Sequence, residues 1–430
     1  MPDRRELGAL GAALAAPGAA VREVAERMAS RVRALAETPS FRRGARVFHD
    51  ERKWIDERHL QICRVPALTF REQERAALLQ ELWADLGLRS ELDEAGNVIA
   101  PLTWNPDAPY VAVSAHLDTT LAPRQESDIF VAPDGSFQGP GVTDNGVGLA
   151  ALVALARALR EGPSVENPRR NVLLVANVAE EGEGNLFGMK RLVHGSIWAP
   201  KIAEYLVLDG ASTAHVTVEA LGSRRFEIII EGRGGHSWND FGRANPVHAL
   251  ARAAALLSDL ELPRSPRATL TVTTIEGGAG VNSIASSARA KVDIRSRSNA
   301  GIDQVVAAME DAVRQAVERE NRRSTDRLSA YRIREIGRRP AAGRSPDNIL
   351  IECLQTVDAY LGIRSRLDCA STDANVPLAA GLPAAAIGAG GRGGDAHAPS
   401  EWYHPEGRPL ALQRILLAIA LLQDCSDAVS

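Results

Sequence analysis

The chain has 430 residues, of which 45% are hydrophobic and 24% are charged, and its formal net charge is -4. This length exceeds the usual size of a single hydrophobic core, so two domains are expected. The weak negative charge argues against partners such as nucleic acid or an anionic membrane, because both need a basic surface. The composition is typical of a soluble globular protein and excludes a disordered chain.

Two features of the sequence bear on location. The four cysteines, Cys63, Cys353, Cys369 and Cys425, are far apart and form no CxxC pair, which disfavours a disulfide framework and favours a reducing compartment. The Ala-rich segment 7–20 is flanked by acidic residues, so a terminal helix is favoured over a signal peptide. A cytoplasmic protein is therefore predicted.

Residues 1–50 match no pattern and are treated as an N-terminal extension of unknown role. Beyond them, apolar residues at helical spacing predict a helix over 70–86 that ends at Gly87. Strands are predicted at 110–119, 171–179 and 203–210, with a helix at 147–160 between the first two. This alternation predicts an α/β domain with a twisted, mostly parallel sheet flanked by helices, built from residues 51–221 and 338–430.

The pattern changes after residue 221. Strands are predicted at 224–232, 268–277, 288–296 and 330–336, and helices at 246–260 and 302–320. The order βαββαβ predicts an inserted ferredoxin-like α+β domain over 222–337, a lid within the larger domain. A final helix is predicted at 408–424.

Two adjacent carboxylates, Glu180 and Glu181, follow the buried strand predicted at 171–179. Ligands bind beyond the carboxyl ends of strands in sheets of this kind. Like charges that lose water there without a counter-charge are costly, so a positive group is expected close by. The alternative is that both glutamates are solvated loop residues.

Other candidate ligands stand at similar places. His116 and Asp118 lie two apart at a strand end, and a carboxylate beside a histidine can hold its second ring N–H. Asp144 precedes the helix at 147–160, where it could equally be a helix N-cap. Asp209 ends a strand or begins a turn, and His397 follows a run of glycines.

Each of these signals is weak alone, but together they indicate a metal centre. His116, Asp144, Glu181, Asp209 and His397 are nitrogen and oxygen donors that suit two divalent cations sharing Asp144, with Zn²⁺ preferred and Mn²⁺ or Co²⁺ as alternatives. Such a pair of cations polarises a carbonyl and activates a shared water. Glu180 would then be free to act as the general base.

The motifs AHLDT, GPGVTDNGVG, EEGEGNLFG, LDG and DAHAPSE, in this order, resemble those of the co-catalytic zinc exopeptidases and deacylases. That family includes glutamate carboxypeptidase, peptidase T, aminoacylase and succinyl-diaminopimelate desuccinylase. The segments STDANVPLAAGLP and GGDAHAPSEW are most similar to the peptidase-T-like branch. The resemblance covers the chain from about residue 60 to the C-terminus.

The resemblance implies one cation held by His116, Asp144 and Asp209 and a second held by Asp144, Glu181 and His397. It also implies that Glu180 is the general base and that Asp118 orients His116. His236 in GRGGHSW would polarise the substrate carbonyl, often across a dimer interface, and Asn282 and Arg295 would bind the substrate. A homodimer formed through the lid domain is expected.

The expected function is metal-dependent hydrolysis of the amide bond of small peptides by a metal-bridged water, as in a di- or tripeptide aminopeptidase. The alternative within the same chemistry is an N-acyl amino acid deacylase or a carboxypeptidase. A nucleotide-dependent enzyme is disfavoured because the glycine-rich turn has neither a GxxxxGK[ST] motif nor a GxGxxG motif after a strand. An inactive metal-binding protein would be expected to lack a ligand or the base, and none is missing.

Overall fold

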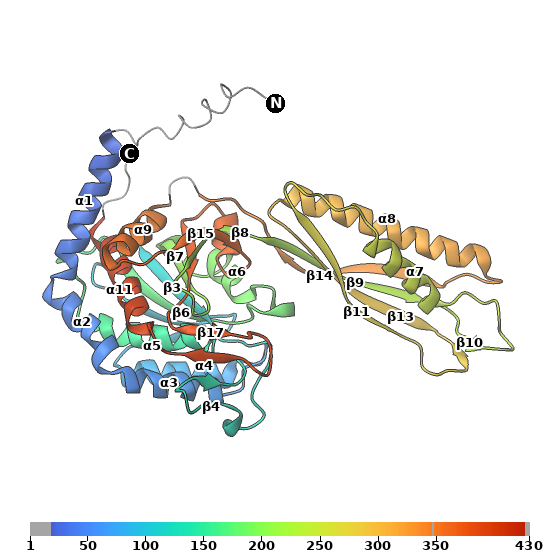
Figure 1. The fold of residues 1–430 in the computed structure, drawn as a ribbon, viewed down its shortest axis with the longest axis horizontal. Helices are drawn as coiled ribbons and strands as arrows, with labels where there is room; N and C mark the ends of the chain where they lie inside the picture. Colours follow the sequence, from blue (N-terminus) through green and yellow to red (C-terminus); the bar gives the residue numbers. More distant parts are fainter. Residues whose placement is uncertain (1–18, 346–347, 426–430) are drawn as a thin grey trace, which may run out of the picture.

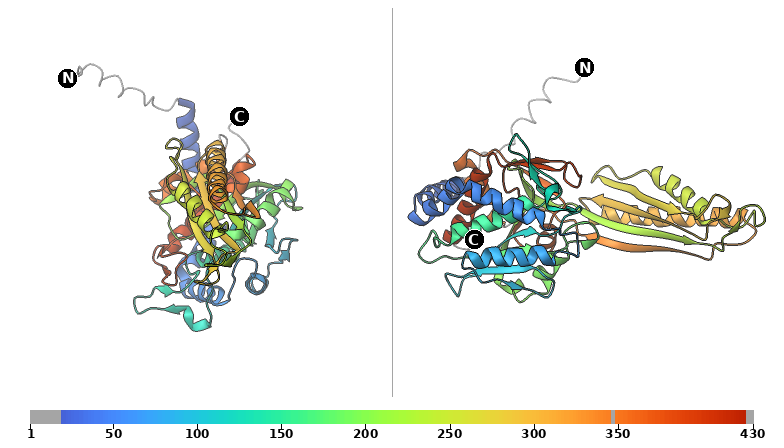
Figure 2. Two further views of the ribbon diagram at one scale, coloured as in Figure 1. Left: turned by 90° about the vertical axis from the view of Figure 1, so that its right-hand side faces the viewer. Right: turned by 90° about the horizontal axis from the view of Figure 1, so that it is seen from below.

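The computed structural model describes residues 19–345 and 348–425. A large domain contains most of the helices, and a smaller lid domain projects from one side of it (Figure 1). Two further views show the lid as an elongated body that lies beyond the edge of the large domain (Figure 2). The predicted fold class, an α/β sheet flanked by helices with an inserted α+β lid, is confirmed.

The large domain is built around an eight-stranded sheet with the order β1-β2-β6-β3-β7-β16-β8-β15. Its strands are β1 (Glu91–Leu92), β2 (Val98–Leu102), β3 (Tyr110–His116), β6 (Asn171–Asn177), β7 (Ile202–Leu208), β8 (His215–Ala220), β15 (Arg366–Ala370) and β16 (Ala384–Ile387). The central strands β6, β3, β7 and β16 are parallel, whereas β2 and β8 pair antiparallel with β6 and β16. The sheet is therefore mixed, and parallel pairing is confined to its centre and to the β8–β15 pair.

Helices cover both faces of this sheet. They are α1 (Ala19–Ala36), α2 (Pro39–Asp50), α3 (Arg52–Arg64), α4 (Gln73–Asp85), α5 (Gly146–Leu159), α6 (Phe187–His194), α9 (Ile349–Leu361), α10 (Asn375–Ala379) and α11 (Arg408–Asp424). Strand β3 is buried throughout and alternates between two apolar cores. Val111 and Val113 belong to the core that includes α5 and α11, and Ala112 belongs to the core that includes α6. Burial on both faces explains why the strand is a continuous apolar run.

The N-terminal helices belong to the large domain. Helices α2 and α3 contact α5, and α1 contacts α9 and α11. The Ala-rich segment for which a terminal helix was expected lies mostly outside the described residues, and α1 begins at its end.

The lid domain has an antiparallel sheet with the order β11-β13-β9-β14. Its strands are β9 (Gly222–Glu231), β11 (Ala268–Gly277), β13 (Ser287–Ser296) and β14 (Ala330–Arg339), and its helices are α7 (Pro246–Ser258) and α8 (Asn299–Arg323). Apolar residues of α7, α8 and one face of the sheet form a separate core. A two-stranded ribbon, β10 (Gly235–His236) with β12 (Ser283–Ile284), lies at the far end of the lid (Figure 1).

A second small sheet, in the order β17-β18-β5-β4, joins two loops of the large domain. It contains β4 (Phe130–Val131), β5 (Phe137–Gln138), β17 (Arg392–Gly394) and β18 (Trp402–His404). Its pairing brings the loop around His397 against the loop that precedes α5. Across the described residues, none of the helices combines the length and the apolar character that a membrane span requires.

Candidate metal centre

The predicted ligands lie at one edge of the large sheet. His116 is the last residue of β3, Glu181 follows β6, and Asp209 follows β7 directly. Because β6, β3 and β7 are adjacent parallel strands, their carboxyl ends meet at this edge. Asp144 enters from the loop before α5, and His397 enters from the loop between β17 and β18.

The side chains form two groups that share Asp144. His116 Nε2 lies 3.0 Å from Asp144 Oδ1, and His397 Nε2 lies 3.0 Å from Asp144 Oδ2 and 2.8 Å from Glu181 Oε1. His116, Asp144 and Asp209 form one group of potential ligands, and Asp144, Glu181 and His397 form the other, each with its ligand atoms within 4.8 Å. These are the two ligand sets that the resemblance implied.

The electrostatics of the cluster fit bound cations. Hydrogen bonds to Asp144 and Glu181 raise the pKa of His397 to about 10, although its partial burial opposes the shift. Burial and the nearby charge of Asp144 raise the pKa of Asp209 to about 7. Both shifts reflect the surplus of negative charge in the cluster. Divalent cations would neutralise that charge, and the donor set of imidazole and carboxylate suits zinc.

Asp118 supports the centre in more ways than expected. The Nδ1 atom of His116 lies 2.9 Å from the backbone carbonyl oxygen of Asp118 and 3.5 Å from its carboxylate, so the carbonyl is the closer partner of the ring. The Asp118 carboxylate instead accepts the backbone N–H groups of Glu180 and Glu181, each at 3.0 Å. Asp118 therefore contacts the histidine and both glutamates, as a residue that orients them would.

Glu401 holds the loop that carries Asp144. Its buried carboxylate accepts the backbone N–H groups of Gly141, Thr143 and Asp144 at 2.7–2.8 Å. The motif DAHAPSE thus supplies both a candidate ligand, His397, and an anchor for the shared ligand. The sequence analysis found the motif but assigned no role to Glu401.

Glu180 lies beside the cluster and pairs with an arginine from the lid. Arg339 Nη1 is 2.7 Å from Glu180 Oε1, and Arg339 Nη2 donates to the Glu180 backbone carbonyl at 2.6 Å. Burial raises the pKa of Glu180 well above its usual value and Glu181 adds to the rise, while the charge of Arg339 opposes it. The positive group expected near the two glutamates therefore includes Arg339, which sequence reasoning missed.

A cleft of about 430 Å³ lies over the cluster, between the two domains. The large domain contributes the predicted ligands and Glu180, and the lid contributes Arg225, Lys291 and Arg295. Arg225 and Arg295 both contact Asp293, and Lys291 Nζ lies 2.7 Å from Glu183. The lid side of the cleft is thus mainly cationic. Arg295 was predicted, whereas Arg225 and Lys291 carried no recognisable motif.

Two predicted residues lie far from the cleft of their own chain. His236 is in β10, with an exposed side chain that accepts the backbone N–H of Trp238 at 3.2 Å. Asn282 precedes β12 and is exposed, and its carbonyl accepts the backbone N–H of Ser237. Because this ribbon lies at the far end of the lid, neither residue lines the cleft (Figure 1).

Comparison with known proteins identifies both domains. A family model described as the peptidase dimerisation domain of the M20 type matches residues 218–321, and the model of peptidase family M28 matches residues 97–238. A succinyl-diaminopimelate desuccinylase from Phenylobacterium zucineum (strain HLK1) is 26% identical over 257 residues. The match covers 56% of this chain and 66% of that protein, just under two thirds of its length.

Solved structures share the fold at low sequence identity. A tripeptidase from Staphylococcus aureus has a TM-score of 0.69 at 18% identity, and the alignment covers 86% of this chain and 98% of that one. A dinuclear metal binding peptidase of the M20 family from Bacillus subtilis has a TM-score of 0.62 at 15% identity, with coverage of 88% and 99%. The family models, the common fold and the related desuccinylase thus agree with the resemblance to metal-dependent exopeptidases and deacylases and indicate a hydrolase.

Proposed function

We propose that the chain is a metal-dependent exopeptidase that cleaves the amide bond of small peptides, as a di- or tripeptide aminopeptidase would. The observation that carries the proposal is the pair of ligand groups sharing Asp144, with the carboxylate of Glu180 beside them. His116, Asp144 and Asp209 would hold one divalent cation, and Asp144, Glu181 and His397 the other. When bound, such cations polarise the scissile carbonyl and make water more acidic.

The residues of the chain would transfer the proton and bind the substrate. Glu180 Oε1 is held by Arg339, whereas no described residue hydrogen-bonds Oε2. Oε2 is therefore the atom that would take the proton of the attacking water and return it to the leaving amine. Arg225 and Arg295 on the lid would bind the substrate carboxylate, because a guanidinium group matches a carboxylate in shape and charge.

The dimer is part of this proposal. The M20-type dimerisation domain supports a homodimer formed through the lid. In such a dimer, His236 would reach the cleft of the partner and donate to the oxygen of the substrate carbonyl. Zinc is the proposed metal because both nitrogen and oxygen donors are present at each ligand group.

Substitution of Glu180 by Gln tests the proposed chemistry. We expect kcat to fall by roughly 10²–10⁴-fold, because a general base is removed, while two metal ions per chain remain bound. Glu181→Gln is the matched comparison, since it changes the neighbouring candidate ligand and should lower the metal content. Elemental analysis and steady-state kinetics give both readouts. Full activity of the Glu180→Gln variant would remove the base from the proposal.

A deacylase is the second candidate, and one observation favours it. The related protein from Phenylobacterium zucineum is a succinyl-diaminopimelate desuccinylase, whose substrate carries an acidic acyl group. The cationic side of the cleft suits that group as well as it suits a peptide carboxylate. Rates on a tripeptide and on its N-succinyl analogue separate the candidates, because an aminopeptidase requires the free amine.

A further inference from the structure

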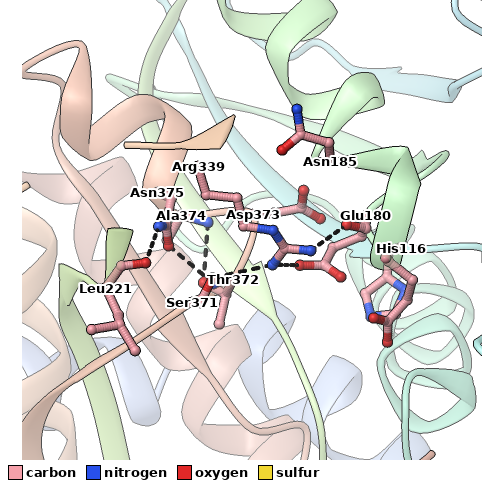
Figure 3. A network of polar contacts seen from close by, with 12 residues as sticks. His116, Glu180, Asn185, Leu221, Arg339, Ser371, Thr372, Asp373, Ala374 and Asn375 are labelled. Atoms are coloured by element: carbon pink, nitrogen blue, oxygen red, sulfur yellow. Dashed lines mark hydrogen bonds and ion pairs between the residues drawn. The ribbon is translucent and has the colours of Figure 1, made fainter. Parts of the chain in front are cut away.

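We propose that Arg339 is a positioning residue that holds the carboxylate of Glu180 in its working orientation and links it to the hinge of the lid. Figure 3 shows Arg339 between Glu180 and the segment 371–375. The inference rests on the proposed role of Glu180 and deepens it. It concerns a side chain that belongs to none of the five motifs that revealed the site.

The contact between the two residues is buried and has two points. The side chains of Arg339 and Glu180 are 5% and 6% exposed. One guanidinium nitrogen binds the carboxylate and the other binds the backbone carbonyl of the same glutamate, at 2.7 and 2.6 Å. A planar guanidinium that binds both the main chain and the side chain of Glu180 restricts the rotation of that side chain, which a single point charge would not do.

Arg339 is itself fixed from the opposite side. Its Nη1 atom lies 3.2 Å from Ser371 Oγ, and Asp373 is drawn beside the guanidinium in Figure 3. Burial alone would lower the pKa of Arg339, but the charges of Glu180 and Asp373 raise it, so the group is held as a cation. Asp373 is in turn bound by Asn177 Nδ2 at 2.7 Å, at the end of β6. The arginine therefore has little freedom to turn away from Glu180.

The same segment also holds the hinge of the lid. Asn375 Nδ2 donates to the carbonyl oxygens of Leu221, just before β9, and Pro340, just after β14, at 2.9 and 3.1 Å. Leu221 and Pro340 are the two places where the chain enters and leaves the lid. Figure 3 shows Asn375 beside Leu221. Arg339 is the last residue of β14, so this one side chain connects the lid, the segment 371–375 and the proposed general base.

Removal of Arg339 should affect turnover more than metal or substrate binding. Without it, Glu180 would be buried beside Glu181 with no direct partner and would be free to rotate. For Arg339→Met we expect kcat to fall by roughly 10–100-fold, as for other groups that orient a reacting residue. KM and metal content should stay close to those of the parent, whereas the melting temperature should fall because a buried ion pair is broken.

A double-mutant cycle distinguishes this role from substrate binding. Kinetics are measured for Arg339→Met, Glu180→Gln and the double variant, all loaded with metal. If Arg339 acts through Glu180, the arginine substitution has no further effect once Glu180 is Gln. A further loss of the same size in the double variant would overturn the proposal, since it would show an independent role. Full activity of Glu180→Gln alone would refute the proposed function instead.

Two other variants complete the test. Arg338→Met is the matched control, because the Arg338 side chain is 61% exposed and pairs only with Glu335 among the described residues. It should leave kcat unchanged. Arg339→Lys keeps the charge but cannot bind the carboxylate and the backbone carbonyl of Glu180 in the same planar arrangement. We therefore expect a loss of kcat between those of the parent and Arg339→Met. If Arg339→Met fails to fold, unchanged kcat in Arg339→Lys overturns the proposal.

Discussion

Glu401 is a buried residue that holds the loop of Asp144, the ligand that the two candidate metal sites would share. The shared ligand Asp144 lies in a glycine-rich loop, and such a loop has little intrinsic rigidity. Three backbone N–H groups of this loop converge on the Glu401 carboxylate. Hydrogen bonds to an ionised group are stronger than neutral ones, so they offset the cost of burying the charge.

Glu401→Gln should therefore weaken metal binding. The amide can accept two of the three N–H groups through its oxygen, but its NH₂ group faces the third donor, at Gly141. We expect metal affinity to fall by roughly 10–100-fold, as for other residues that orient ligands. Competition with a chromophoric chelator measures this. Glu406→Gln is the control, because Glu406 is exposed and pairs with Arg392, and equal affinities in both variants would contradict the role.

At the residue scale, the sequence predicted the groups that follow strand ends and missed those brought in by tertiary structure. His116, Glu181 and Asp209 are recognisable because each stands at the end of an apolar strand, where a charge is unusual. Arg339 is separated from Glu180 by 159 residues and comes from another domain. Nothing in its local sequence distinguishes it from Arg338, whose side chain points to solvent.

At the scale of elements, long and strongly patterned segments were predicted well. Helix α5 and strand β11 match their predicted ranges to within one residue. Helix α5 is an apolar segment that is buried along almost its whole length, whereas β11 is largely exposed and is recognised by its β-branched residues. Strands β2 and β8 were not predicted, and they make the sheet mixed by pairing antiparallel with β6 and β16. Strand β8 follows β7 after a short loop, but β16, which lies between them in the sheet, comes from beyond the lid, so no local pattern records the pairing of β8 with β16.

The helices of the N-terminal region also have a role that the sequence did not disclose. His59 of α3 is buried, and its Nε2 atom lies 2.7 Å from the carbonyl oxygen of Val142, two residues before Asp144. Burial and the nearby Arg408 lower the pKa of His59 to about 3. The neutral ring thus connects α3 to the loop that contains Asp144, and it packs against the ring of Tyr403.

This burial predicts a loss of stability in acid that originates at α3. His59 binds a proton in the unfolded chain below pH about 6.5 but not in the folded chain until about pH 3, so stability falls as the pH drops through this interval. At pH 5 the free energy of unfolding is lower by about 2 kcal/mol than at neutral pH because of His59. His59→Gln keeps an N–H donor for Val142 but does not titrate.

Urea unfolding of both proteins at pH 7.5 and pH 5 measures the effect. The free energy of unfolding should fall less on acidification in the His59→Gln variant than in the parent. Because both chains retain the histidines of the metal centre, the difference between them isolates His59. An identical pH dependence in the two proteins would show that the ring is not held neutral.

At the scale of the whole molecule, the lid ribbon places His236 away from the cleft of its own chain. The ribbon lies at the end of the lid farthest from the cleft (Figure 1). The loops next to it present Trp238, Phe241 and Val281 as exposed apolar residues. Exposed apolar residues that gather beside polar ones are typical of protein interfaces. The dimerisation model covers this ribbon, which supports contact with a second copy.

Complementation between two inactive chains tests whether His236 acts across the dimer. The Glu180→Gln chain lacks a competent cleft but presents an intact His236, and the His236→Ala chain has the opposite defect. In a mixed dimer, the cleft of the His236→Ala chain would receive the histidine of its partner. Random exchange makes half of the dimers mixed, each with one complete site, so about a quarter of the parent activity should return.

The control is a mixture of Glu180→Gln with Asp144→Ala, in which both clefts are defective and no arrangement of subunits is complete. Distinct affinity tags on the two chains establish by co-purification that exchange has occurred. Activity that returns only in the first mixture requires His236 to serve the partner's cleft, because neither chain alone contains both groups. If exchange occurs and no activity returns, His236 does not act across the interface, and the lid ribbon contributes contacts between subunits but no group for the reaction.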